Sequence, residues 1–87
     1  MKPVEIYTTA ACPYCVAAKN FLSQRGYAYE EVRVDLDPAR REEMLARSQG
    51  RRTVPQIFFG ETHVGGFDDL VAASRAGSLP SVQEVAP

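Results

Sequence analysis

The sequence contains no tryptophan, a single histidine and two cysteines, and its net charge at pH 7 is only −1. It has no stretch near the roughly 20 apolar residues of a membrane-spanning helix, and its first residues lack the apolar core of a secretory signal. One histidine and one cysteine pair supply too few ligands for a zinc site. A net charge this close to zero predicts no broad basic surface for nucleic acid. We therefore expect no metal, nucleic-acid or membrane partner, and a cytoplasmic location, where thiols are kept reduced.

The length and composition predict one small globular domain. The chain has 87 residues, of which 45 % are hydrophobic and 24 % are charged. A chain of this length buries roughly 60 to 65 % of its unfolded-chain surface, which is enough for a single core. We expect one domain over residues 1–87, acting as a monomer. Residues 80–87 have weak periodicity and a proline at each end, which indicates a loosely held tail.

Hydrophobic periodicity predicts alternating strands and helices. A helical pattern from Tyr14 through Leu22 ends at Gly26, a residue suited to a helix C-terminus. Asp37 and Asp68 predict the N-caps of two further helices, ending near Ser48 and Gly77. Strands are predicted at 4–7, 29–35, 56–59 and 62–64, the last two forming a hairpin. The order β-α-β-α-β-β-α predicts an α/β fold with a four-stranded mixed sheet and helices on both faces.

Two cysteines lie where the first strand gives way to the first helix. Cys12 and Cys15 are three residues apart, so in a helix they share a face and can form a disulfide. Pro13 suits the first helical position, which makes Cys12 the N-cap. Free backbone N–H groups and the positive helix end favour a thiolate there, whereas Cys15 is more shielded. We predict that Cys12 attacks a disulfide and that Cys15 resolves the product.

Two other interpretations of this pair are weaker. A structural disulfide closing four residues would remove only about 2 kcal/mol of unfolded-chain entropy, which is a small gain in stability. Half of a zinc site would need two further ligands, and the single His63 lies far along the sequence on a predicted hairpin strand. We interpret His63 as a surface or edge side chain, and the aromatic residues Tyr7, Phe21, Phe58 and Phe59 as core.

Three motifs in this order resemble a dithiol glutaredoxin: Cys-Pro-Tyr-Cys at 12–15, Thr-Val-Pro-Gln-Ile-Phe at 53–58 and Gly-Gly-Phe-Asp-Asp-Leu at 65–70. The likeness runs from about Val4 to Gly77. It implies a thioredoxin-like fold with Pro55 in cis. It also implies a glutathione-dependent thiol-disulfide oxidoreductase, which reduces protein-glutathione mixed disulfides and protein disulfides with glutathione as cosubstrate. The resemblance implies glutathionylated and disulfide-bonded proteins as partners, and ribonucleotide reductase as a further candidate.

The resemblance also implies where glutathione binds. The backbone of Val54 would pair with its cysteinyl part, and Arg41 would clamp its glycyl carboxylate; a solvated position on the helix surface is the alternative for Arg41. A helix N-terminus near Asp68 would suit the carboxylate of the γ-glutamyl end, and an Asp would suit its ammonium. The full set of implied contacts is Tyr14, Arg41, Thr53, Val54, Pro55, Gly66, Phe67, Asp68 and Asp69.

The chain departs from the resemblance at two places. Many glutaredoxins have a lysine shortly before the first cysteine, whereas this chain has Thr-Thr-Ala-Ala at 8–11. The segment 49–52 is one residue longer than usual, which leaves the directions of Arg51 and Arg52 open. Two rival functions remain: an electron donor to ribonucleotide reductase that is itself reduced by a flavoprotein reductase, and an iron-sulfur carrier with glutathione ligands.

Overall fold

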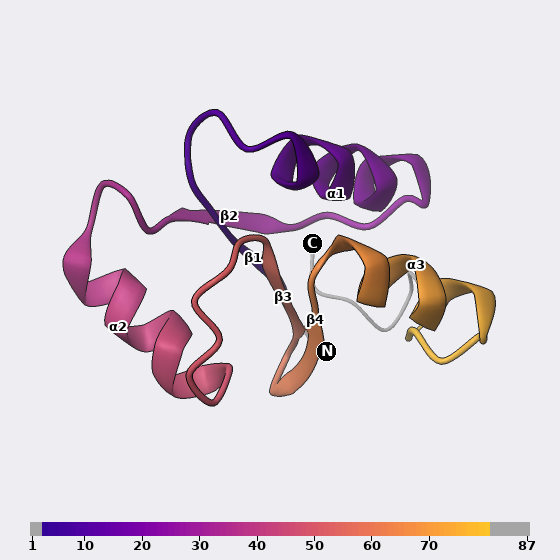
Figure 1. Ribbon diagram of the computed structural model, residues 1–87. Coiled ribbons are helices and arrows are strands. Elements are labelled where there is room, and N and C mark those ends of the chain that lie inside the picture. Colours follow the sequence, from indigo (N-terminus) through magenta and orange to yellow (C-terminus); the bar gives the residue numbers. More distant parts are fainter. Residues whose placement is uncertain (1–2, 81–87) are drawn as a thin grey trace.

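The computed structural model describes residues 3–80, and within them the predicted order of elements is confirmed. The sheet has the strand order β2-β1-β3-β4 (Figure 1). β1 and β2 are parallel, and β3 pairs antiparallel with both of its neighbours. The elements are β1 (Val4–Thr8), α1 (Pro13–Gln24), β2 (Glu30–Arg33), α2 (Pro38–Arg47), β3 (Gln56–Phe59), β4 (Thr62–Gly65) and α3 (Phe67–Arg75).

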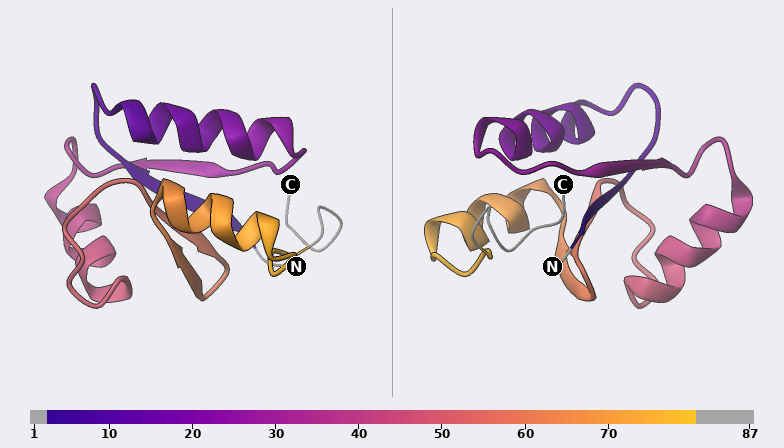
Figure 2. Two further views of the ribbon diagram at one scale, coloured as in Figure 1. Left: turned by 45° about the vertical axis from the view of Figure 1, so that its right-hand side comes forward. Right: turned by 180° about the vertical axis from the view of Figure 1, so that it is seen from behind.

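Helices cover both faces of the sheet, as the sequence predicts. α1 and α3 lie on one face and α2 on the other (Figures 1 and 2). The core between the sheet, α1 and α3 consists of Val4, Ile6, Ala18, Leu22, Ile57, Phe59 and Leu70. The core on the α2 side consists of Tyr7, Val32, Val34, Met44 and Phe58. Tyr7, Phe58 and Phe59 are fully buried, and Phe21 packs partly buried against the first core.

Most helix ends follow the local sequence. Asp37 caps α2 by accepting a hydrogen bond from the backbone N–H of Ala39 at 3.0 Å. Gly26 takes a left-handed φ of 84° just beyond α1, which confirms it as the stop signal. The strand predicted at 29–35 is shorter, because only Glu30–Arg33 pairs as β2.

The predicted N-cap of the last helix is wrong. α3 begins at Phe67 with Gly66 as its N-cap, so Asp68 already lies in the first turn. The next residue, Asp69, accepts a hydrogen bond from the backbone N–H of Gly66 at 2.9 Å. An acidic residue three positions after the N-cap commonly makes this bond. Of two consecutive aspartates, the second is therefore the one that fixes the helix end.

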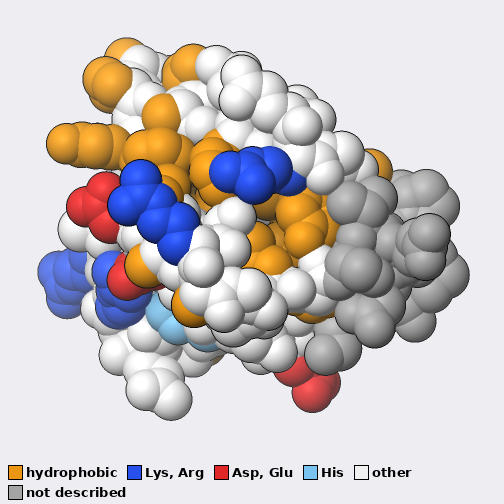
Figure 3. All heavy atoms as spheres, turned by 90° about the vertical axis from the view of Figure 1, so that its right-hand side faces the viewer, with side chains coloured by type: hydrophobic (Ala, Val, Ile, Leu, Met, Phe, Trp, Pro, Cys, Tyr) orange, Lys and Arg blue, Asp and Glu red, His pale blue; other side chains and the backbone are white. Residues whose placement is uncertain are grey.

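The next features are the absence of a membrane-spanning helix from the described residues, the distribution of surface charge and the predicted C-terminal tail. In residues 3–80, no helix has the length and apolar character needed to cross a membrane. On the face in Figure 3, the Lys and Arg side chains form small groups next to hydrophobic and acidic ones. The predicted tail at 80–87 lies, apart from Pro80, outside the described residues.

Candidate active site

Cys12 caps α1 and is partly exposed. Its backbone is extended, with φ −114° and ψ 103°, and Pro13 occupies the first helical turn, as predicted. The Cys12 sulfur accepts a hydrogen bond from the backbone N–H of Cys15 at 3.2 Å. It also lies 3.9 Å from the carbonyl oxygen of Val54. A sulfur that receives an N–H at a helix N-terminus is held where negative charge is stabilised.

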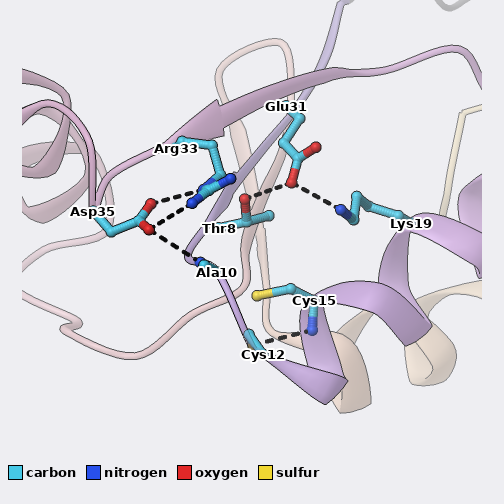
Figure 4. Close-up of polar contacts among 8 residues, drawn as sticks. All are labelled: Thr8, Ala10, Cys12, Cys15, Lys19, Glu31, Arg33 and Asp35. Atoms are coloured by element: carbon cyan, nitrogen blue, oxygen red, sulfur yellow. Dashed lines mark hydrogen bonds and ion pairs between the residues drawn. The ribbon is translucent and has the colours of Figure 1, made fainter.

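Cys15 has the opposite environment. Both cysteines are free thiols, but Cys15 is only 1 % exposed. Its side chain points from α1 toward the end of β1 and the loop after it (Figure 4). Burial, with a further contribution from the neighbouring Cys12, raises the pKa of Cys15 to about 12. Cys15 is therefore a protonated thiol at neutral pH, which suits a resolving residue that reacts only after Cys12.

This difference predicts selective alkylation. At pH 7 only about one Cys15 thiol in 10⁵ is ionised, because its pKa is about 12. We expect iodoacetamide to label Cys12 in the folded protein, with Cys15 at least on the order of 100-fold slower. Peptide mapping by mass spectrometry measures both rates. The urea-denatured chain is the control, in which the two rates should converge; equal labelling in the folded protein would contradict the assignment.

A cavity lies beside Cys12. The Val54–Pro55 peptide bond is cis, as the resemblance implies, and the carbonyl oxygen of Val54 lies 3.9 Å from the Cys12 sulfur. The cavity has a volume of about 170 Å³. It is bounded by the start of α1, the loop before β3 and the start of α3. Its lining consists of Tyr14, Arg51, Thr53, Val54, Pro55, Gly66, Phe67, Asp68 and Asp69.

The cavity carries charges of both signs. Arg51 contributes the cation, and its guanidinium lies 3.5 Å from a carboxylate oxygen of Asp69. The same oxygen holds the N–H of Gly66, so Asp69 has two partners. Asp68 is exposed and has no ion-pair partner within residues 3–80. A ligand with both an ammonium group and carboxylates would find a complement for each here.

Two polar clusters support the segment that leads into Cys12 (Figure 4). Asp35 accepts the backbone N–H of Ala10 at 3.2 Å and two bonds from Arg33 at 2.7 and 2.6 Å. The hydrogen bonds from Arg33 hold the pKa of the Asp35 carboxyl well below its usual range. The loop before Cys12, in which Ala11 has a left-handed φ of 54°, is thereby tied to the end of β2.

The second cluster joins the end of β1 to β2 and α1 near Cys15 (Figure 4). The hydroxyl of buried Thr8 donates to Glu31 at 2.7 Å, and Glu31 also pairs with Lys19 at 2.9 Å. Lys19 follows Cys15 by four residues, so it lies one turn further along the same face of α1. It is a cation that the sequence interpretation did not connect with the thiols. Its pairing with Glu31 links α1 to β2.

Eight of the nine predicted glutathione contacts line the cavity, and Arg41 does not. Arg41 is exposed on α2, so its clamping role stays a prediction. Arg51, whose direction could not be predicted from the sequence, does line the cavity. Gly65 was also missed. Its φ is 116°, and a Cβ there would lie 2.4 Å from the Asp69 carboxylate, so the site depends on this glycine. The two consecutive glycines, Gly65 and Gly66, were the sequence feature that could have identified this position.

The comparisons decide the family. The family profile described as glutaredoxin matches residues 4–64. The chain belongs to the glutaredoxin family. It is 55 % identical to a glutaredoxin of Pseudomonas aeruginosa, over 94 % of this chain and 96 % of that protein. It is 52 % identical to glutaredoxin 3 of Escherichia coli, over 91 % of this chain and 94 % of that protein.

A solved structure supports the same assignment. The buckwheat glutaredoxin-glutathione complex superposes with a TM-score of 0.78 at 31 % identity, covering 90 % of this chain and 73 % of that one. Glutaredoxins are thiol-disulfide oxidoreductases, and this member has a pair of free thiols, Cys12 and Cys15, in the part of the chain that the structure describes. Within residues 3–80, no group of three or more His, Cys, Asp or Glu side chains is arranged to hold a metal ion.

Proposed function

We propose that this glutaredoxin uses glutathione to reduce protein-glutathione mixed disulfides and protein disulfides, with Cys12 as nucleophile and Cys15 as resolving thiol. One observation carries the proposal: the partly exposed Cys12 sulfur lies against Val54, which also lines a cavity with charges of both signs. The buckwheat relative was solved as a complex with glutathione, which supports the same ligand here.

The cavity offers a complementary group for each end of glutathione. The backbone of Val54 faces the cysteine and can pair with the cysteinyl part of the tripeptide. Asp68, which has no ion-pair partner in the described part of the chain, would take the ammonium. The N–H groups at the start of α3 favour a carboxylate. Arg51 would take the other carboxylate, a role that the resemblance implies for Arg41.

Deglutathionylation needs only Cys12. Its thiolate attacks the glutathione sulfur of a mixed disulfide, forming a Cys12-glutathione disulfide while the protein sulfur leaves as a thiolate and takes a proton. A second glutathione thiolate then attacks the glutathione sulfur on Cys12, giving glutathione disulfide and restoring the Cys12 thiolate. The cavity accelerates both steps by holding glutathione with its sulfur facing Cys12.

Reduction of a protein disulfide needs both cysteines. Cys12 attacks one sulfur of the substrate and releases the other as a thiol. Cys15 then loses its proton and attacks the Cys12 sulfur, which frees the substrate and leaves a Cys12–Cys15 disulfide. Two glutathiones reduce this disulfide and leave as glutathione disulfide. The raised pKa of Cys15 keeps it from reacting with other disulfides before Cys12 has done so.

Removing the cavity cation should weaken glutathione binding. We expect Arg51→Gln to raise the KM for glutathione about tenfold, because one charge-assisted hydrogen bond contributes about 1.5 to 3 kcal/mol. Arg41→Gln is the matched control, since Arg41 is exposed outside the cavity lining. Steady-state kinetics of both variants shows which of the two arginines binds the glutathione carboxylate. A large effect of Arg41→Gln alone would restore the role that the resemblance implies for Arg41.

The proposed function is tested by NADPH consumption with glutathione, glutathione reductase and a glutathionylated protein. A parallel reaction supplies thioredoxin reductase in place of glutathione and its reductase. We expect turnover only in the first reaction. Turnover only with thioredoxin reductase would mean that the protein is an electron donor of the thioredoxin type and that the cavity does not bind glutathione.

A further inference from the structure

The only histidine of the chain, His63, begins a chain of hydrogen bonds that reaches the cavity. Its Nε2 lies 2.6 Å from the side-chain oxygen of Gln56. The amide nitrogen of Gln56 lies 3.0 Å from the carbonyl oxygen of Thr53 and 3.2 Å from the Thr53 hydroxyl oxygen. Gln56 is fully buried, whereas Thr53 lines the cavity. Three side chains thus connect β4 to the proposed binding site.

The fold places these groups on one side of the sheet. His63 pairs with Phe58 across β3 and β4, and Gln56 precedes Phe58 by two residues, so all three share a face. The His63 ring stacks on Phe58, with centroids 4.7 Å apart and planes 22° apart. The Arg47 guanidinium lies 4.1 Å from the centre of the same Phe58 ring. The imidazole is therefore held in a fixed orientation.

The direction of each hydrogen bond follows from the chemistry of Thr53. A backbone carbonyl can only accept, so the group of Gln56 that faces Thr53 must be the NH₂. The side-chain oxygen of Gln56 then faces His63 and needs a donor. Burial, and next the nearby Arg51, lower the pKa of His63, so at pH 7 the ring is neutral and carries one N–H. That hydrogen must be on Nε2.

The same reasoning applies to the Thr53 hydroxyl. Its oxygen accepts from Gln56, which leaves its own hydrogen for another acceptor. We propose that His63 and Gln56 are positioning residues that set the Thr53 hydroxyl as a donor to a carbonyl or carboxylate oxygen of glutathione in the cavity. This inference rests on the proposed function only for the identity of the ligand. The sequence offered no sign of it, because His63 and Thr53 are ten residues apart on different segments.

The hydrogen-bond direction is tested on the unmodified protein, without any substrate. Long-range ¹H–¹⁵N NMR distinguishes the two neutral forms of an imidazole, and a chain with one histidine gives one unambiguous set of signals. The protein must carry no histidine tag. We expect the Nε2–H form at a pH where the ring is neutral. A predominant Nδ1–H form would overturn the proposal, since the ring could not then donate to Gln56.

The functional consequence is tested by variants at His63. His63→Phe keeps a ring to stack on Phe58 but removes the donor. We expect it to raise the KM for a small glutathione mixed disulfide about three- to tenfold, with kcat within about twofold. His63→Gln should restore the KM, because its amide nitrogen reaches about as far as Nε2. His63→Asn, whose amide is shorter, should not. A lowered melting temperature with unchanged KM in His63→Phe would overturn the proposal.

A double-mutant cycle shows whether His63 acts through Thr53. Thr53→Val removes the hydroxyl and keeps the shape of the side chain. We expect His63→Phe to have a smaller effect on KM in the Thr53→Val background than in the unchanged chain. Fully additive effects would overturn the proposal. If the unchanged chain showed no glutathione-dependent turnover, the proposed function would fail, while the NMR result would still decide the direction of the bonds.

Discussion

Replacing Cys15 by serine is expected to separate the two activities of this glutaredoxin. The variant should remove glutathione from proteins at a rate within about threefold of the unchanged chain, because only Cys12 takes part in that reaction. It should lose reduction of protein disulfides, because nothing then releases the substrate from Cys12. The physical basis is the contrast between a partly exposed sulfur at a helix N-terminus and a buried thiol whose pKa is about 12.

Cys12→Ser is the matched variant and should abolish both activities. Serine fits the N-cap position at least as well as cysteine, so the helix should remain intact. Circular dichroism and thermal unfolding of both variants check this point. Full reduction of protein disulfides by Cys15→Ser, measured with a disulfide-bonded protein in the glutathione-coupled assay, would end the proposed division of labour.

Gly65→Ala is expected to lower both the stability of the protein and its affinity for glutathione. Gly65 has a left-handed φ of 116°, which costs other residues roughly 1 to 2 kcal/mol. The new Cβ would lie 2.4 Å from the Asp69 carboxylate, so Asp69 must move and release the N–H of Gly66. Losing that bond costs about 1 kcal/mol more. We expect a total loss of about 2 to 3 kcal/mol in the free energy of unfolding.

Gly50→Ala provides the control for this prediction. Gly50 has a similar φ of 91°, but nothing lies within 4 Å of a Cβ added there. Both variants should show the backbone strain, and only Gly65→Ala should also raise the KM for glutathione. Urea unfolding and steady-state kinetics of the pair measure the two effects. Equal losses of stability with an unchanged KM in both would show that Asp69 neither moves nor shapes the site.

The fold follows closely from local signals in the sequence. Pro13 after Cys12, Pro38 after Asp37 and Gly26 after α1 each specify a helix end by backbone chemistry alone. The strands at 4–7 and 56–59 are short runs rich in apolar residues, each directly preceded by a proline. The end of β2 was overestimated, because alternation continues past the residues that find a partner in β1.

The details of the site depended on contacts that the sequence does not encode locally. Asp68 and Asp69 look equivalent in sequence, and only the backbone path at Gly66 decides which of them caps α3. Arg51 lies in the loop between α2 and β3, where no periodicity fixes the direction of a side chain, so its direction could not be read from the sequence. His63 was expected to be a surface or edge side chain and does lie on the edge strand β4, but its contacts with Phe58 and Gln56 were not predicted. Each of these contacts joins segments that are distant in sequence or curved by glycines.

In the proposed mechanism, Cys12 takes glutathione onto its own sulfur while the cavity holds the tripeptide. Mass spectrometry of the intact Cys15→Ser variant, quenched with acid during turnover of a glutathionylated protein, tests it most directly. We predict that a glutathione adduct accumulates on Cys12 and disappears when free glutathione is added. An adduct of Cys12 with the substrate protein, with no glutathione adduct at any time, would contradict the account, because Cys12 would then attack the protein sulfur.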